Sequence, residues 1–283
     1  MNWRLLVTEP HDGATNMAVD EVLLRARSRD SGAPTVRFYG WRPATVSLGY
    51  AQSLDETVDR ARCDALGIGL VRRPTGGSAI LHEPPEREVT YSVVAREGDF
   101  AGASDVLETY RIIGQGLAAG LGRLGVRAQL TSLVRGRQPA AGSPAFCFRR
   151  AGVYELAVEG RKLVGSAQRR QRGAFLQHGS VLLDADPARI RAVFPREAEP
   201  TSGMTTLADT LGRSPGFDTV AAALAGGLAD VLGVRLVPTG LSRDERTQVE
   251  SLVQAKYGTE VWTTLGRMPD RVEAAGTPAG AVS

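Results

Sequence analysis

Two β-type runs joined by a short turn place the strongest constraint on how this 283-residue chain folds. In the first run, Tyr154, Leu156 and Val158 alternate with smaller or charged residues, as a half-buried strand requires. The turn Glu159-Gly160 follows, and a second β-rich run comes directly after it. Because a glycine-containing turn between two such runs is typical of a β-hairpin, we predict a hairpin here.

The predicted hairpin points to an activated cysteine. Lys162 enters the second strand and Cys147 precedes the first, so the folded-back chain can bring a thiol and an ammonium together. A nearby ammonium lowers the pKa of a thiol, and the thiolate is the reactive form. A plainer alternative stays open for each residue. Cys147, between Phe146 and Phe148, is then a small buried hydrophobe, and Lys162 is a solvated lysine.

The composition is that of an ordinary soluble globular protein, with 42% hydrophobic and 23% charged residues. No apolar run approaches the roughly 20 residues that a membrane helix needs. The first six residues have too short an apolar run, and no small-residue cleavage pattern, for a signal peptide. We therefore expect a cytoplasmic protein that does not act at a membrane.

The cysteine and histidine pattern predicts no disulfide framework and no metal site. Cys63 and Cys147 form no CxxC motif, and in a reducing compartment two such cysteines are expected as free thiols. The three histidines, His11, His82 and His178, are far apart in sequence.

The charge balance is mildly basic, with a net charge of +3 and a pI near 9.1, and it does not indicate nucleic-acid binding. Arginines cluster at 149–150 and at 169–172, around the predicted site. Such clusters would steer acidic protein partners by long-range attraction. A solvated basic face is the alternative.

Periodicity and turn residues predict the other elements. Expected strands are residues 1–8, 35–39, 44–49, 68–73, 88–95, 126–131 and 173–183. Expected helices are residues 17–24, 53–65, 105–124, 217–232 and one opened by the capping box Ser242-Arg243-Asp244-Glu245. Within the third helix, Gly114, Gly116 and Gly120 are expected to allow close packing on a sheet.

A glycine pair marks a second candidate binding element. Gly76-Gly77 follows a predicted strand, and glycines there let the backbone approach a ligand closely because no Cβ is in the way. Free N–H groups in such a loop suit a carbonyl, carboxylate or phosphate, and Arg72 and Arg73 favour an anion. A plain tight turn is the alternative.

The chain is expected to form one domain over residues 1–265. Prolines and glycines punctuate residues 184–215, which predicts a main body at 1–185 and a helical C-terminal part at 186–265. Residues 266–283 are rich in Gly, Pro and Ala without periodicity and are predicted to be a disordered tail.

Four motifs together resemble one superfamily, the lipoate–protein ligase, octanoyltransferase and biotin–protein ligase group. They are residues 16–21 (NMAVDE), 72–82 (RRPTGGSAILH), 162–168 (KLVGSAQ) and 177–180 (QHGS). The likeness runs from about residue 1 to about residue 265. The chain most resembles the cysteine-dependent octanoyltransferases of many Gram-positive bacteria, and Lys256-Tyr257-Gly258 followed by Trp262 is similar to the C-terminal end of that subgroup.

The resemblance implies an α+β fold with a central mixed β-sheet flanked by helices, like the catalytic domain of biotin ligases. It implies an octanoyltransferase without a cofactor, expected as a monomer. The donor would be octanoyl-acyl carrier protein, and the acceptor a lysine of a lipoyl domain or of glycine cleavage H protein, in the first step of lipoate assembly.

The resemblance also assigns the site. Cys147 would carry the acyl group as a thioester, and Lys162 would lower the pKa of its thiol. The implied substrate-binding residues are Arg73, Gly76, Gly77, Ser78, His82, Gly165, Ser166, Ala167, Gln168, His178 and Gly179.

Physical chemistry agrees with this mechanism. A thioester donor is already activated, so transfer to an amine needs no ATP, and a cysteine can hold the acyl group between two partners. Backbone N–H groups near the glycines would bind the developing oxyanion. Both partners are acidic carrier domains in the family, which suits a basic rim.

Two positions depart from the family pattern. Ser78 stands where these transferases commonly carry arginine and the ligases glycine, and the loop at residues 83–88 looks longer than usual. Both bear on the pocket mouth, so acyl length and donor preference stay open.

Three competing functions fit parts of this pattern. An ATP-dependent lipoate–protein ligase shares the glycine loop and the lysine, but it has no need of a nucleophilic cysteine. An amidotransferase that moves octanoyl between lipoyl-bearing proteins would use the same residues. A non-enzymatic binder of lipoyl domains would keep the fold, but an intact cysteine, lysine and glycine loop argue against it.

Overall fold

The computed structural model describes residues 1–100, 105–131, 155–195 and 201–268. These residues form an eight-stranded mixed sheet, a three-stranded sheet beside it, and helices on both faces of the larger sheet. The expected fold class, α+β with a central mixed β-sheet flanked by helices, is confirmed.

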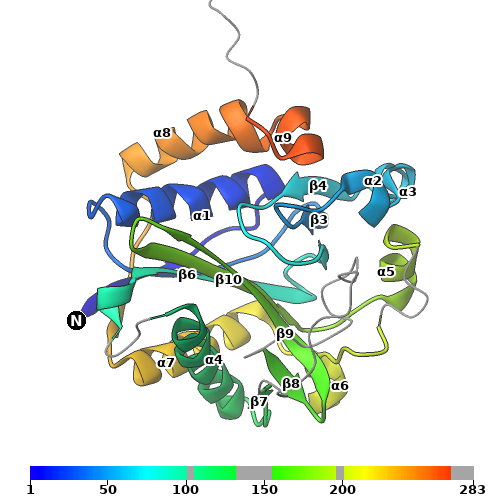
Figure 1. Ribbon diagram of the computed structural model, residues 1–283. Coiled ribbons are helices and arrows are strands. Elements are labelled where there is room, and N and C mark those ends of the chain that lie inside the picture. Colours follow the sequence, from blue (N-terminus) through cyan, green and yellow to red (C-terminus); the bar gives the residue numbers. More distant parts are fainter. Residues whose placement is uncertain (101–104, 132–154, 196–200, 269–283) are drawn as a thin grey trace, which may run out of the picture.

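The large sheet runs through the middle of the molecule (Figure 1). β1 pairs in parallel with both of its neighbours, and every other pairing in this sheet is antiparallel. The strands in order across the sheet are β11 (Arg235–Pro238), β1 (Asn2–Val7), β2 (Thr35–Tyr39), β6 (Glu88–Arg96), β10 (Ala174–Leu182), β9 (Arg161–Gln171), β8 (Leu156–Val158) and β7 (Gln129–Leu130).

The small sheet has β3 (Thr45–Leu48) at its centre. β4 (Gly69–Arg72) pairs with β3 in parallel, and β5 (Ile80–His82) pairs with it antiparallel. The glycine loop connects β4 to β5, so both of its ends are fixed by the same central strand.

Four longer helices cover the large sheet. In Figure 1, α1 (Gly13–Ser28) and α8 (Arg243–Leu252) lie above it, and α4 (Val106–Arg123) and α7 (Phe217–Leu232) lie below it. The shorter helices are α2 (Leu54–Thr57), α3 (Arg60–Ala65), η1 (Glu97–Asp99), α5 (Pro187–Val193), α6 (Leu207–Leu211), the π-helical turn η3 (Val253–Tyr257) and α9 (Glu260–Leu265).

Side-chain caps explain where the main helices begin. The Asp12 carboxylate accepts a hydrogen bond from the N–H of Thr15 at 2.7 Å and starts α1. The predicted capping box before α8 is confirmed, because Ser242 and Glu245 each accept a hydrogen bond from the other's backbone N–H. Such caps satisfy N–H groups that the helix itself leaves without acceptors.

The predicted hairpin is also confirmed. β8 and β9 pair antiparallel with Val158 opposite Arg161. Glu159 and Gly160 have φ angles of 49° and 77°, the left-handed conformation that a two-residue hairpin turn needs at both positions. Lys162 therefore lies on β9, as predicted, whereas Cys147 lies outside the described residues.

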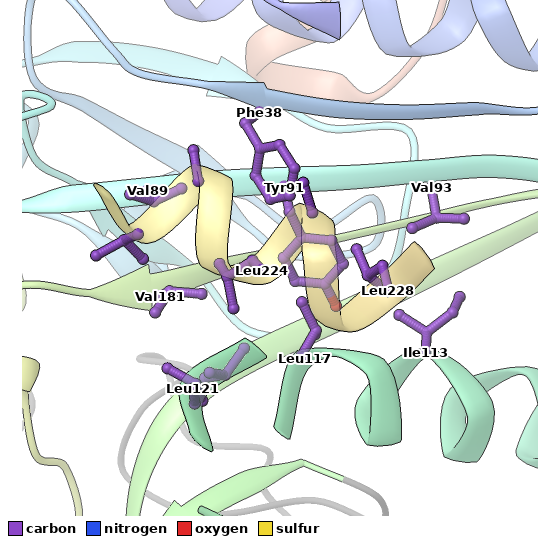
Figure 2. Close-up of a cluster of buried hydrophobic side chains, with 14 of the residues drawn as sticks. Phe38, Val89, Tyr91, Val93, Ile113, Leu117, Leu121, Val181, Leu224 and Leu228 are labelled. Atoms are coloured by element: carbon purple, nitrogen blue, oxygen red, sulfur yellow. The ribbon is translucent and has the colours of Figure 1, made fainter. Parts of the chain in front are cut away.

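The largest hydrophobic cluster lies between the large sheet and the helices α4 and α7. Figure 2 shows Leu117 and Leu121 from α4 and Leu224 and Leu228 from α7 gathered around Tyr91 of β6. Fully burying one such aliphatic side chain contributes about 1.5–3 kcal/mol to the free energy of folding. This cluster therefore stabilises the large sheet, which carries the motifs at residues 162–168 and 177–180.

Several sequence-based predictions need correction. The helix predicted over 53–65 is two short helices, α2 and α3, which Val58 and Asp59 separate in extended conformations. The strand predicted over 126–131 is only the two residues of β7, and β5 was not predicted.

The α4 glycines also pack differently from the prediction. They approach helix α7 rather than a sheet: a Cβ on Gly116 would lie 2.7 Å from Leu228, and one on Gly120 would lie 2.6 Å from the Cα of Leu224. The two helix backbones can come this close only because neither position carries a side chain.

The C-terminal residues share the core of the main body. β11 extends the large sheet beside β1, and Arg4 of β1 forms a salt bridge of 2.6 Å with Glu245 of α8. The division at residue 186 stays a prediction.

Among the helices of the described residues, none has the length and apolarity to span a bilayer.

We predict opposite effects for two alanine substitutions on α4. Gly120→Ala should lower the free energy of unfolding by about 1–3 kcal/mol, because the new methyl group overlaps the α7 backbone. The control is Gly122→Ala two residues on, where nothing lies within 4 Å. It should stabilise the protein by up to about 1 kcal/mol through helix propensity. Urea unfolding measures both, and equal values for the two variants would contradict the helix contact.

Candidate active site

A cavity lies where the large sheet, the small sheet and α1 meet. Its empty volume, including its opening to solvent, is about 380 Å³. Its apolar lining residues include Met17, Trp41, Ile80 and Ala167. The lining residues are Met17, Tyr39, Trp41, Ser47, Arg73, Gly77, Ile80, His82, Thr90, Ser166, Ala167, His178 and Gly179.

Strand register explains why separate motifs meet at this cavity. In the β9–β10 pair, Ala167 lies opposite His178 and Ser166 lies opposite Gly179. Two of the four sequence motifs are thus cross-strand neighbours. The glycine loop of the small sheet brings the third motif against them, because Thr75 Oγ1 and His178 Nε2 lie 2.7 Å apart.

The fourth motif supplies a buried carboxylate beneath the cavity. Asp20 of α1 is fully buried, and its two carboxylate oxygens accept four hydrogen bonds of 2.9–3.0 Å. The donors are Arg37 and Tyr39 from β2, Ser92 from β6 and His178 from β10. Burial alone would raise the pKa of Asp20, but the hydrogen bond from His178 and the charge of Arg37 outweigh burial and lower it.

The same contacts fix the tautomer of His178. Burial lowers the pKa of His178 below its usual value, although Asp20 acts in the opposite direction. The neutral ring donates from Nδ1 to Asp20, so Nε2 is left to accept the hydroxyl proton of Thr75. His178 therefore links the carboxylate in α1 to the glycine loop.

His82 forms a second histidine–carboxylate pair on the cavity wall. Its Nδ1 lies 2.7 Å from Oε1 of Glu88, and its Nε2 lies 2.8 Å from Oγ of Ser47. Trp41 stacks on the imidazole with ring centroids 3.9 Å apart. The indole N–H donates to Thr90 Oγ1, whose own hydroxyl donates to Glu88 at 2.7 Å. His82 is thereby held on two edges and one face.

The two arginines before the glycine loop hold backbone carbonyls. Arg73 donates to the carbonyl oxygens of Ser47, Gly76 and Ser78, each at 2.8 Å. Arg72 donates to the carbonyl oxygens of Gly49, Tyr50, Gln52 and residues 262–264. In this structure the arginine pair thus fastens the loop and the neighbouring chain, where the sequence suggested attraction of an anion.

The glycine loop also depends on a close backbone approach. A Cβ on Gly49 would lie 1.8 Å from the carbonyl oxygen of Gly77, and Gly77 itself has a φ of 89°. Only glycine fits both conditions without strain. The close approach seen here is to the segment after β3, and the approach of this loop to a ligand stays a prediction.

Helix α9 packs against the segment that precedes the glycine loop. The Trp262 indole N–H donates to the carbonyl oxygen of Arg72 at 2.8 Å, while Arg72 donates back to the end of α9. Lys256 stacks over the Trp262 ring at 3.9 Å and forms a 2.6 Å ion pair with Glu21 of α1. The C-terminal motif residues therefore brace the small sheet against α1.

Lys162 lies on β9 in a buried ion pair. Its Nζ donates to Oε1 of Glu155 at 2.6 Å, and only 1% of its side chain is exposed. The expected alternative of a solvated lysine is therefore wrong. Cys147, its predicted partner, lies outside the described residues.

The other thiol is unreactive by environment. Cys63 is buried in the cluster beneath the small sheet, and this burial raises its pKa to about 11. A thiol with such a pKa is almost entirely protonated at neutral pH. Cys63 therefore does not compete as a nucleophile.

The remaining predicted site residues fall into two groups. Gly76 and Gln168 border a second, more open hollow, together with Tyr50, Pro74 and Arg169. Ser78 and Gly165 line neither space: the Ser78 carbonyl accepts from Arg73, and Gly165 pairs with Ser180 inside the sheet. Arg73, Gly77, His82, Ser166, Ala167, His178 and Gly179 do meet at the cavity.

Sequence reasoning missed several residues that build this site. Asp20 stood inside a motif without a role, and Ser47, Glu88 and Glu155 were not singled out as site residues. A polar or charged residue within a strand-like run is the signal that could have found the last three. Their partners could not be named, because each partner lies on another element.

A known protein family matches most of the chain. The family model described as "Lipoyl protein ligase A/B catalytic domain" matches residues 12–229 of the chain. The chain belongs to this family. The expected membership is thus confirmed over all four motifs of the cavity.

Individual relatives extend the likeness over most of the chain. The chain is 46% identical over 271 residues to "Octanoyltransferase LipM" of Kyrpidia tusciae, covering 92% of this chain and 97% of the relative. It is 44% identical over 274 residues to the protein of the same name from Symbiobacterium thermophilum, with the same coverage.

The family fold is also seen in a solved structure. A lipoate-protein ligase A bound with ATP superposes with a TM-score of 0.78 at 25% identity, covering 93% of this chain and 99% of the ligase. The fold is therefore compatible with the alternative left open by the sequence, an ATP-dependent ligase.

We predict that His178 makes the stability of this family member depend on pH. The unfolded chain binds a proton at His178 near pH 6.5, whereas the folded protein, with its lowered pKa, does not until the pH is lower. The free energy of unfolding should therefore fall from pH 7 to pH 5, by at most about 1.4 kcal/mol per pH unit. Asp20 contributes only at lower pH, near and below the ordinary aspartate pKa of 3.8.

Urea unfolding of His178→Gln at several pH values checks this. The variant should lose part of the slope between pH 7 and pH 5. The pKa of His11 is also lowered by burial, and His11 contributes to the pH dependence of the unfolding free energy in both proteins. Identical slopes for wild type and variant would contradict the assignment.

Proposed function

We propose that this protein is an octanoyltransferase that moves an octanoyl group from octanoyl-acyl carrier protein to a lysine of a lipoyl domain or of glycine cleavage H protein. The observation that carries the proposal is its 46% identity to a protein named "Octanoyltransferase LipM" across nearly the full length of both chains. The cavity supports it, since apolar side chains form much of its wall and suit a hydrocarbon chain.

Cys147 is the proposed nucleophile. Its thiolate attacks the carbonyl carbon of the donor thioester, the bond to the carrier sulfur breaks, and the released thiolate takes a proton. The acyl group then sits on Cys147 as a thioester. The acceptor amine attacks this thioester, loses its proton and becomes an amide, and the cysteine thiol is restored.

Lys162 is the proposed cation that stabilises the negative charges formed in this reaction. It is the cation that the KLVGSAQ motif contributes, and it is buried four residues before Ser166 of the cavity wall. An ammonium in a buried environment stabilises a nearby anion far more strongly than one in water. It would favour the thiolate before attack and the oxyanion during it.

The polar groups of the cavity wall have a positioning role in this proposal. His82 and His178 are each fixed by a buried carboxylate, and Arg73 holds the glycine loop. A rigid wall keeps the acyl carbonyl in one place without reorganisation during the reaction.

The carrier proteins would dock at the open hollow beside the cavity. Tyr50 is 48% exposed there, and Arg169 lies on its border. Acyl carrier domains are acidic, and a basic rim attracts them. The enzyme is proposed to act as a monomer.

The test is intact-mass spectrometry of the protein mixed with octanoyl-acyl carrier protein without ATP. The wild-type protein should gain one octanoyl group that hydroxylamine removes, and Cys147→Ala should gain none. Cys63→Ala is the matched control and should be acylated like the wild type, because burial already keeps that thiol protonated.

Adding an apo lipoyl domain or glycine cleavage H protein should then discharge the adduct and identify the acceptor. Acceptor modification only after ATP and free octanoate or lipoate are supplied would instead mean that the protein is a ligase. An adduct formed from an octanoylated lipoyl protein, and not from the acyl carrier protein, would mean an amidotransferase.

A further inference from the structure

Glu155 shares a buried ion pair with the proposed catalytic lysine. The Glu155 side chain is 9% exposed and Lys162 is 1% exposed, and their charged atoms lie 2.6 Å apart. Removing an ammonium from water costs several kcal/mol unless an anion compensates it. Glu155 is therefore part of what allows a charged lysine at this position.

The local backbone holds this pair in place. Lys162 pairs with Ala157, and the register then shifts between Ala157 and Leu156, so that β9 carries one extra residue. Such a bulge re-aims side chains. The backbone N–H of Lys162 donates to Gly203, and its carbonyl accepts from Thr205, which fixes the bulge from a third segment.

Glu155 is anchored on its own side by Thr131. The Thr131 N–H donates to the Glu155 carbonyl at 2.8 Å, and the Glu155 N–H donates to Thr131 Oγ1 at 3.1 Å. Both members of the ion pair therefore have fixed main chains. A change of one side chain will act mainly on the other side chain.

The charge of Glu155 also acts on Tyr91, whose hydrogen bonds lead to the cavity wall. Burial raises the pKa of Tyr91 to about 12, with the nearby charge of Glu155 adding to the effect. The Tyr91 hydroxyl lies 2.7 Å from Oγ of Ser166 on the cavity wall and accepts from Gln177 at 3.2 Å.

Among the described residues, two other titratable groups are related to this pair. Tyr91 of β6 is influenced by the charge of Glu155, and Arg161 is the sequence neighbour of Lys162 on β9. At neutral pH Tyr91 is uncharged. Within the described part of the chain, Glu155 forms an ion pair with Lys162.

We propose that Glu155 is a positioning residue that keeps Lys162 charged and aimed, so that the lysine can stabilise the reacting thiolate. This inference rests on the proposed function. Glu155 does not touch substrate in this proposal; it acts through Lys162. Its loss should therefore change the pH dependence of the cysteine, and not only the stability of the fold.

The experiment measures the alkylation rate of Cys147 by iodoacetamide from pH 5 to pH 10. It uses a Cys63→Ala background, so that Cys147 is the only thiol. Glu155→Gln should move the half-maximal rate to higher pH by about one unit or more, which is about a tenfold slower reaction at neutral pH. Glu155→Asp keeps the charge on a shorter side chain and should shift the profile less.

The chain provides a matched control in its other buried lysine–glutamate pair. Glu21 and Lys256 are also 2.6 Å apart and 5% exposed each, but they lie between α1 and η3. Glu21→Gln should lower the melting temperature without moving the alkylation profile. This separates a specific effect on the cysteine from the general loss of a buried ion pair.

Each outcome decides a different point. An unchanged profile, or one moved to lower pH, in Glu155→Gln overturns the role of Glu155. If Glu155→Gln does not fold, the Glu155→Asp profile carries the same decision. In parallel, the wild-type protein is tested for octanoyl uptake from octanoyl-acyl carrier protein. Uptake with an unmoved profile overturns the role of Glu155 alone, and no uptake overturns the proposed function and this inference with it.

Discussion

The fully buried carboxylate of Asp20 connects the elements on which the site depends. It lies in α1 and accepts hydrogen bonds from β2, β6 and β10, and through His178 it reaches Thr75 in the glycine loop of the small sheet. A buried carboxylate is stable only when its hydrogen bonds are made. The helix, the strands and the loop therefore have one mutual arrangement that satisfies it, and this arrangement forms the cavity.

A second set of polar contacts fixes the opposite side of the cavity. Arg72 and Arg73 donate to carbonyl oxygens from the segment after β3, from the glycine loop and from α9. The hydrogen bonds of Arg72 behind this wall thus join segments that are up to 192 residues apart in the chain. Because each wall is held by several hydrogen bonds, the site is organised before any substrate enters, which suits a reaction that depends on fixed charges and donors.

Local patterns predicted those elements that local interactions decide. The β8–β9 hairpin followed from alternation and a glycine turn, and the start of α8 followed from a capping box. The two-residue β7 and the three-residue β5 escaped prediction, because so short a strand exists only through its partners. Likewise, the α4 glycines predicted a close contact, but only packing determined that the neighbour is α7.

The sequence by itself determined the family, the motif residues and the strand that carries Lys162, since these depend on residue identity and on short-range pattern. Only the tertiary structure decided the partners: Glu155 for Lys162, Asp20 for His178, Glu88 for His82, and backbone carbonyls for both arginines. The physical reason is that a buried charge or hydrogen-bonding group takes the complementary group that packing brings next to it. Strand register and layer packing set that neighbour, and neither can be read from the residues on either side of it in the chain.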